Sequence, residues 1–130
     1  MKNPILILFL FSLSFSDIIY PENNSTLNTT HVLFEWEQVP EAISYTITWL
    51  DGNNPDIVID EKNTESLIYI HKEIFNWNNN YTWYTKAIFS DESYSYILNT
   101  DESNHLNHFN ISASRSNAYS IEHFPSQYSE

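Results

Sequence analysis

Alternation of apolar and polar residues, which is the period of a half-buried β-strand, recurs along much of the chain. It is clearest over residues 43–49, where one face carries Ile43, Tyr45, Ile47 and Trp49. Residues 32–36 and 81–89 alternate in the same way. Shorter apolar runs predict four further strands, at 57–59, 67–70, 94–96 and 109–111. Since no window has sustained helical spacing, the pattern predicts a chain of short strands.

Turn signals separate the predicted strands. Asp51-Gly52 directly follows residues 43–49 and predicts a hairpin in which Gly52 is free to adopt a positive φ. Polar composition predicts a loop over 17–30 and a turn over 60–66. Short strands at intervals of about ten residues are typical of an antiparallel sandwich or barrel. We therefore predict an all-β fold of six or seven short strands, arranged as an antiparallel sandwich or barrel.

The N-terminal segment has the three parts of a secretory signal peptide. Lys2 gives a positive start, an apolar block follows over 4–11, and Ser14-Phe15-Ser16 places small residues before Asp17. The block is shorter than the roughly 20 residues that a membrane span needs. The alternative is that the block is a buried element of the domain. The sequence thus predicts a signal peptide over 1–16 and secretion, or export to the periplasm or cell surface if the host is a bacterium.

A single domain is predicted after the signal peptide, over residues 17–112. Residues 113–130 are rich in Ser, Asn and Tyr, contain Pro125 and have no apolar period. We expect them to form a flexible tail, or a linker to a following domain that is missing from the chain.

Composition excludes several classes of function. With 5 Lys and Arg against 17 Asp and Glu, the chain is acidic, with a formal net charge of −12, and offers no basic face for a nucleic acid. The absence of cysteine excludes disulfides, Cys-ligated zinc and a thiol nucleophile. A single glycine, Gly52, excludes a Gly-rich phosphate loop. No membrane partner is predicted once the signal peptide is removed.

Five asparagines stand in Asn-x-Ser/Thr triplets, which are N-glycosylation acceptors in a secreted eukaryotic protein. They are Asn23, Asn24, Asn28, Asn80 and Asn110. In such a host they would mark exposed loops. The equal alternative is chance occurrence in a chain rich in Asn and Ser, because the sequence does not identify the host.

Three segments, preceded by Pro21, together resemble a fibronectin type III module. They are Phe34-Glu35-Trp36, Ala42-Ile43-Ser44-Tyr45-Thr46-Ile47 and Tyr81-Thr82-Trp83-Tyr84-Thr85-Lys86-Ala87. The resemblance implies an all-β fold, an antiparallel seven-stranded immunoglobulin-like sandwich. It further implies a structural signature of Trp36, Tyr45, Tyr81, Trp83 and Ala87. It also implies that Tyr81 is a tyrosine-corner residue, whose hydroxyl bonds back to the preceding loop. Thr85 departs from the family, which usually has Val at that position.

Candidate catalytic and metal-binding residues form no strong motif. His105 and His108 lie close in sequence, with His123 downstream, but a zinc site needs three or four converging ligands. The acidic residues around 51–61 and 91–102 lack the register of a calcium-binding loop. The sequence contains neither a nucleophile elbow nor a paired-carboxylate motif. We therefore predict no catalytic residues, no metal site and no cofactor.

The large aromatic residues divide into predicted core and surface positions. The core positions, on the inward faces of their strands, are Trp36, Trp49 and Trp83. Tyr84 falls on an outward face, and Trp77 lies just before a turn. An exposed patch of Trp77 and Tyr84 would be able to stack on sugar rings. The alternative is that Trp77 caps the core.

Two classes of function fit these observations. The first is a secreted non-catalytic module that binds or spaces, for example the N-terminal accessory domain of a larger exported protein. Its partner would be a protein or a carbohydrate, and it would be monomeric or tethered to a following domain. The alternative is the N-terminal fragment of an exported enzyme acting on polysaccharides or sulfate esters, such as a glycoside hydrolase or a sulfotransferase.

The signal-peptide interpretation predicts that the mature protein begins at or near Asp17. The small residues at Ser14 and Ser16 fit the cleavage site that follows an apolar segment. Mass spectrometry of the intact secreted protein measures the new N-terminus directly. Exported protein that still carries Met1 would contradict the interpretation.

Overall fold

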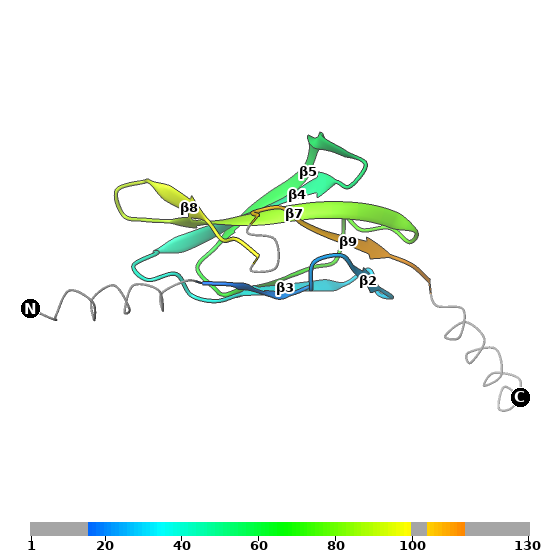
Figure 1. Cartoon of the computed structure of the whole chain (residues 1–130), viewed down its shortest axis with the longest axis horizontal. Helices are drawn as coiled ribbons and strands as arrows, with labels where there is room; N and C mark the ends of the chain where they lie inside the picture. Colours follow the sequence, from blue (N-terminus) through cyan, green and yellow to red (C-terminus); the bar gives the residue numbers. More distant parts are fainter. Residues whose placement is uncertain (1–15, 100–103, 114–130) are drawn as a thin grey trace, which may run out of the picture.

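Two β-sheets face each other in the computed structural model, which describes residues 16–99 and 104–113. The smaller sheet has the order β1-β3-β6, with β1 at Ile18–Tyr20, β3 at Val32–Trp36 and β6 at Ile68–His71. The larger sheet has the order β2-β9-β7-β4-β5, and β8 pairs with β7. Its strands are β2 (Ser25–Leu27), β4 (Ser44–Asp51), β5 (Asn54–Thr64), β7 (Asn79–Ile88), β8 (Tyr94–Tyr96) and β9 (Asn107–Ile111). Figure 1 shows β3 in one layer and β4 and β7 in the other.

The all-β class predicted from the sequence is confirmed, since the described residues contain nine strands and no helix. Seven of these strands correspond to the seven apolar runs. The other two, β1 and β2, lie within residues 17–30, so the prediction of a loop there was wrong. Both are only three residues long and are held by backbone pairing, β1 to β3 and β2 parallel to β9, which leaves no periodic pattern in the sequence. The predicted signal peptide and tail fall outside the described residues, apart from Ser16 and Ala113.

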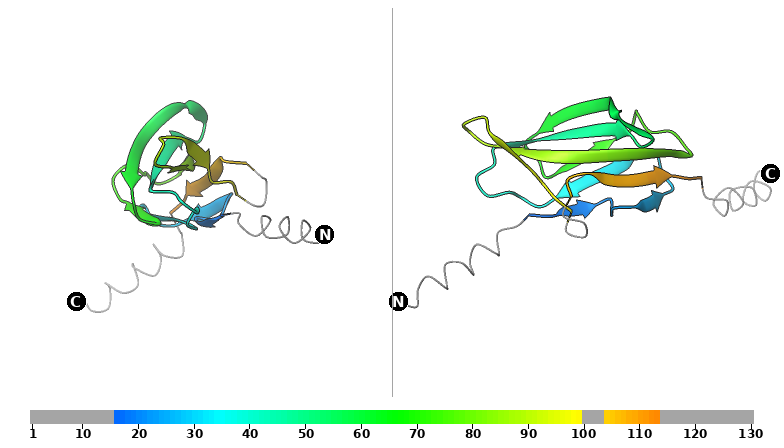
Figure 2. Two further views of the ribbon diagram at one scale, coloured as in Figure 1. Left: turned by 90° about the vertical axis from the view of Figure 1, so that its left-hand side faces the viewer. Right: turned by 45° about the horizontal axis from the view of Figure 1, so that its top comes forward.

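The turn predicted over residues 60–66 is also wrong, because β5 runs from Asn54 to Thr64. The strand pairs with β4 from Trp49↔Asp60 to Tyr45↔Thr64. An edge strand can be polar and still pair fully along one side, because its side chains remain in water. Seen end-on in Figure 2, the green segment containing β5 runs along one side of the sandwich toward the smaller sheet.

Gly52 is required because the hairpin approaches β7 closely, and not because of its backbone angles. The predicted hairpin is present between β4 and β5, but Gly52 does not have a positive φ. Its N–H donates to the Asn80 carbonyl oxygen at 3.0 Å, and a Cβ would lie 2.5 Å from the Asn80 carbonyl carbon. A side chain at this position would therefore force the hairpin away from β7.

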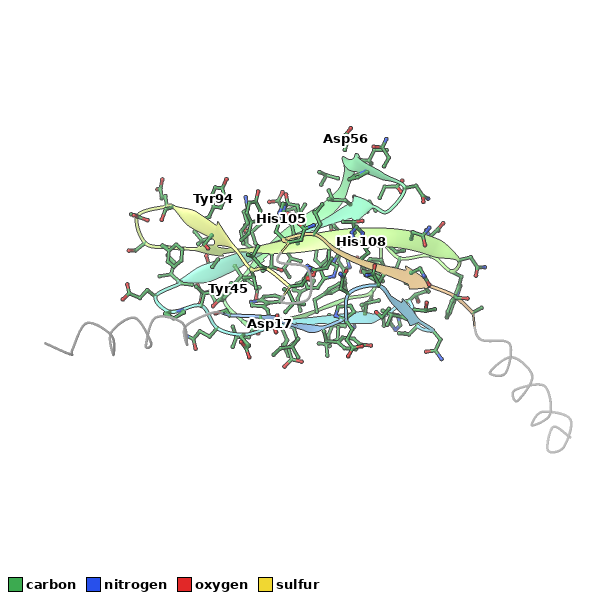
Figure 3. All side chains as sticks on the ribbon, in the orientation of Figure 1. Asp17, Tyr45, Asp56, Tyr94, His105 and His108 are labelled. Carbon is green, nitrogen blue, oxygen red and sulfur yellow. The ribbon has the colours of Figure 1, made fainter. Side chains whose placement is uncertain are left out.

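The core lies between the sheets and is dominated by aromatic rings. All five signature residues of the sequence analysis are buried, namely Trp36, Tyr45, Tyr81, Trp83 and Ala87. Figure 3 shows Tyr45 between the two layers. Its hydroxyl accepts a hydrogen bond from the Val39 N–H at 3.0 Å. Ile43, which the alternation placed on the same face, lies before β4 and is 56% exposed.

Threonines are buried on both faces of the larger sheet, whereas the alternation predicted this only for Thr85 on the inner face. On the outer face, Thr46 Oγ1 donates to Asn63 Oδ1 at 2.7 Å, and the hydroxyl of Thr82 hydrogen-bonds His108 Nδ1 at 3.1 Å. On the inner face, the Thr85 hydroxyl is buried and has no hydrogen-bond partner. A buried hydroxyl without a partner loses its hydration without compensation.

Replacing Thr85 with Val should raise the free energy of unfolding by about 1 kcal/mol, because the methyl group fills the same space without an unpaired hydroxyl. The matched control is Thr82→Val, which removes a hydroxyl that is hydrogen-bonded and should lower stability by a similar amount. Urea denaturation of both variants measures the difference. A loss of stability in Thr85→Val would show that its hydroxyl is satisfied in solution.

Candidate functional site

Four aromatic side chains gather on the outer face of the larger sheet. This aromatic cluster consists of Tyr84 on β7, Tyr94 and Tyr96 on β8, and His105 just before β9. In Figure 3, Tyr94 and His105 lie on the upper side of the larger sheet, whereas Asp17 lies at the smaller sheet. The cluster therefore faces away from the core.

The rings of the aromatic cluster contact one another. The Tyr96 and His105 ring centroids are 4.2 Å apart with an interplanar angle of 30°. Tyr84 meets each of these two rings edge-on at 5.5 Å. Tyr94 meets Tyr96 edge-on at 5.6 Å. Since Tyr94 is 54% exposed and Tyr96 is 37% exposed, both keep ring surface that a ligand can contact.

Strand pairing places the tyrosines together. Tyr96 pairs with Lys86, and Tyr94 pairs with Ile88. Tyr84 lies two residues before Lys86, and side chains two apart on a strand share a face. The Tyr-Ser-Tyr alternation of β8 therefore puts both of its tyrosines on the side of Tyr84.

A buried amide network holds the segment that carries His105. The Asn99 side chain donates to Asn107 Oδ1 and to the Asn104 carbonyl oxygen, each at 3.2 Å. Asn107 is fully buried and donates to the carbonyl oxygens of Trp83 and His105 at 3.4 and 3.3 Å. Such a satisfied network fixes the described residues 104–107 in one arrangement against β7. Sequence reasoning missed Asn99 and Asn107, because their polar surroundings gave no sign of burial.

Lys86 and the protonated Tyr96 hydroxyl determine the electrostatics of the aromatic cluster. Lys86 Nζ lies 4.5 Å from the Tyr94 ring centroid, in a cation–π contact. Burial raises the pKa of Tyr96, and the neighbouring Tyr94 and Tyr84 raise it further. Tyr96 therefore keeps its proton at physiological pH, and its hydroxyl can both donate and accept hydrogen bonds.

Trp77 and Tyr84 do not form the patch expected from the sequence. Trp77 lies in the turn before β7 and is 47% exposed, but it makes no ring contact within the described residues. The ring partners of Tyr84 are instead Tyr96 and His105. Alternation predicted the outward face of Tyr84, but strand pairing decided which rings lie beside it.

The five sequon asparagines lie in different surroundings. Asn80 and Asn110 pair with each other across β7 and β9, so the expectation that all five mark loops was wrong. Asn24 and Asn28 have exposed side chains. Asn23 Oδ1 accepts the His108 N–H at 2.8 Å, and its Nδ2 is buried without a partner. Attachment of a glycan to Asn23 would require this contact to open.

A carboxylate–imidazole pair joins the edges of the two sheets. Asp60 on β5 lies 2.7 Å from Nε2 of His71 on β6. Nδ1 of His71 accepts the Glu73 N–H at 3.5 Å, which leaves the proton on Nε2 for donation to Asp60. The imidazole is 5% exposed and packs against Trp49, with 4.6 Å between ring centroids. Both ring nitrogens are occupied, so the pair links β5 to β6 as a structural clamp.

The clamp keeps Asp60 ionised. Burial raises the pKa of Asp60, but hydrogen bonds from His71 and the Glu61 backbone, together with the charge of Lys62, outweigh it. The pKa of Asp60 consequently lies below its ordinary value.

His105 and His108 do not converge on a shared point. His105 stacks on Tyr96, whereas His108 hydrogen-bonds Thr82. Among the described residues, no group of three or more His, Asp or Glu is placed to hold a metal ion. His123 lies outside those residues.

Comparisons of the chain with protein-family models, curated proteins and solved structures found no match. Within residues 16–99 and 104–113, no helix has the length and apolarity to cross a bilayer.

The Asp60–His71 clamp predicts a specific pH dependence. The pKa of Asp60 is lower in the folded protein than in the unfolded chain. The ionised Asp60 therefore stabilises the folded protein above about pH 4, and this contribution is lost as the pH falls through the folded pKa. Asp60→Asn should therefore lower stability by about 1 kcal/mol at neutral pH and by less in acid. Urea denaturation at neutral pH and in acid measures the free energy of unfolding, and a variant of an exposed residue, Asp56→Asn, is the control. Equal losses at both pH values would contradict an ionic contribution.

Proposed function

We propose that this chain is an exported, fibronectin type III-like module that binds neutral carbohydrate through the aromatic cluster. The strand order supports the fold assignment. In chain order, β1, β3 and β6 share one sheet, while β4, β7 and β9 are neighbours in the other, as the A, B, E and C, F, G strands are in immunoglobulin-like sandwiches. In this scheme β5 is an additional strand beside β4, and β2 and β8 are short additions.

The position of Tyr81 gives further support for the fold assignment. Its hydroxyl accepts the Asn76 N–H at 2.7 Å, which is the bond to the preceding loop that the resemblance implies. The ring packs against Phe75 and Phe109, with centroids 4.9 and 5.6 Å away. The hydroxyl thus fixes the loop while the ring remains in the core.

The observation that carries the binding function is the exposure of Tyr94 and Tyr96 on a sheet face. Core packing accounts for the buried aromatic residues, but it does not account for these two rings. Sugars present apolar C–H faces to aromatic rings and hydroxyls to polar groups, and tyrosine offers both surfaces in one side chain. The net charge of −12 favours a neutral glycan over a sulfated or uronic one.

The fixed backbone around the aromatic cluster also supports a binding role. Tyr96 is paired to β7, and His105 is held by Asn107 and Asn99. A preformed surface loses little conformational entropy when it binds, so a small contact area can still give measurable affinity. Because this role needs no reacting group, the proposed module is non-catalytic. The alternative that the chain is the N-terminal fragment of an exported enzyme stays a separate prediction.

Removing a ring of the aromatic cluster should weaken carbohydrate binding. Titration with soluble oligomers of glucose, mannose, xylose and N-acetylglucosamine, followed by calorimetry and NMR, identifies a ligand. For that ligand, Tyr94→Ala and Tyr96→Ala should each lower affinity roughly tenfold, the equivalent of about 1.4 kcal/mol. Trp77→Ala is the matched control, because Trp77 is similarly exposed but lies outside the cluster.

Two results would overturn the proposal. The first is the absence of binding to every oligomer in the panel. The second is a loss of affinity in Trp77→Ala with unchanged affinity in both tyrosine variants, which would place the site at the turn before β7.

A further inference from the structure

The outer face of the smaller sheet is apolar, with a carboxylate among its side chains. In one row across the sheet, Glu35 of β3 pairs with Tyr20 of β1 on one side and Ile68 of β6 on the other. In the next row, Leu33 pairs with Ile70. The exposed fractions of Tyr20, Ile68 and Ile70 are 37%, 45% and 53%. We call this surface, which lies on the opposite side of the sandwich from the aromatic cluster, the Glu35 face.

The Glu35 face continues into a recess beyond the start of β6. The recess has a volume of about 540 Å³, and its walls include Ile43, Leu67 and Ile68. Ile43 is 56% exposed at this position. The apolar surface is therefore not flat, and its recess can receive a side chain of a partner.

Glu35 has no counter-charge in the described part of the chain. Its side chain is half-buried, and it makes neither a hydrogen bond nor an ion pair within residues 16–99 and 104–113. A carboxylate among apolar side chains gains most when a cation pairs with it and excludes water. Further carboxylates lie nearby, since Glu65 lines the recess and Glu37 follows β3 directly.

A second copy of the chain does not suit this face. Two-fold pairing places the same patch of both copies together, which brings the two Glu35 carboxylates toward each other. Each copy also carries a formal charge of −12. Like charges disfavour such an interface, so a partner of opposite charge suits this face better than a second copy.

We propose that the Glu35 face docks a cationic amphipathic segment of another protein. A Lys or Arg of that segment pairs with Glu35, and its apolar side chains cover Ile68 and Ile70 and enter the recess. The segment is an amphipathic helix or strand whose apolar residues surround a basic one. This docking is independent of the aromatic cluster, so one module can hold a glycan and a protein on opposite faces.

The test uses the full chain and a synthetic Leu/Lys amphipathic peptide of about 14 residues as probe, a length typical of groove-binding helices. A twin peptide with Glu in place of Lys is the charge control. Calorimetry gives the affinity, and backbone amide NMR shifts give the site. The variants are Glu35→Gln and Ile70→Ser, and their matched controls are the exposed Glu61→Gln and Val58→Ser on β5.

We expect the Leu/Lys peptide to shift amides of β3 and β6, and the Glu twin not to bind. Glu35→Gln and Ile70→Ser should weaken the affinity roughly fivefold or more, whereas the two β5 controls change it less than about twofold. Equal weakening by Glu35→Gln and Glu61→Gln would overturn the proposal, because binding would then follow net charge alone. Sedimentation that shows self-association abolished by Ile70→Ser would also overturn it, since a second copy would occupy the face.

Discussion

The fold depends on the packing of one ring, that of Phe34, between the two sheets. Phe34 of β3 inserts between the tryptophans of the larger sheet, with its ring centroid 5.4 Å from Trp49 and 4.8 Å from Trp83. Phe75 and Phe109 complete its surroundings at 5.9 and 5.8 Å. Edge-on packing of this kind adds to the burial energy of the rings, which supplies most of the stability of a small domain without disulfides.

Polar groups act where this apolar packing ends. The Asp60–His71 clamp joins the edges of the two sheets, and its imidazole packs against Trp49. Asn107 fills a fully buried position at the start of β9 and ties it to Trp83 of β7. In both contacts the polar side chain bonds a residue of another strand, so ordering it lowers stability little and fixes one arrangement of the strands.

The two outer faces can differ because the core does not constrain them. On the larger sheet, short strand β8 adds Tyr94 and Tyr96 beside Tyr84, which gives an aromatic surface with Lys86 against the Tyr94 ring. On the smaller sheet, apolar residues surround Glu35 instead. Alternating side chains let a sandwich keep one shared core while its two outer faces differ in composition.

The sequence by itself determined the all-β class and the inward direction of residues such as Trp49 and Trp83, because the two-residue period of a strand is a local property. It did not reveal the strand character of Asp60, the burial of Asn107, or the meeting of His105 with Tyr96. A run of polar residues predicts a loop even where a partner strand pairs with its backbone. That partner strand can be far away in sequence. Only the tertiary structure decided these features, since strand pairing across the sheets determines which polar groups are satisfied and which aromatic rings meet.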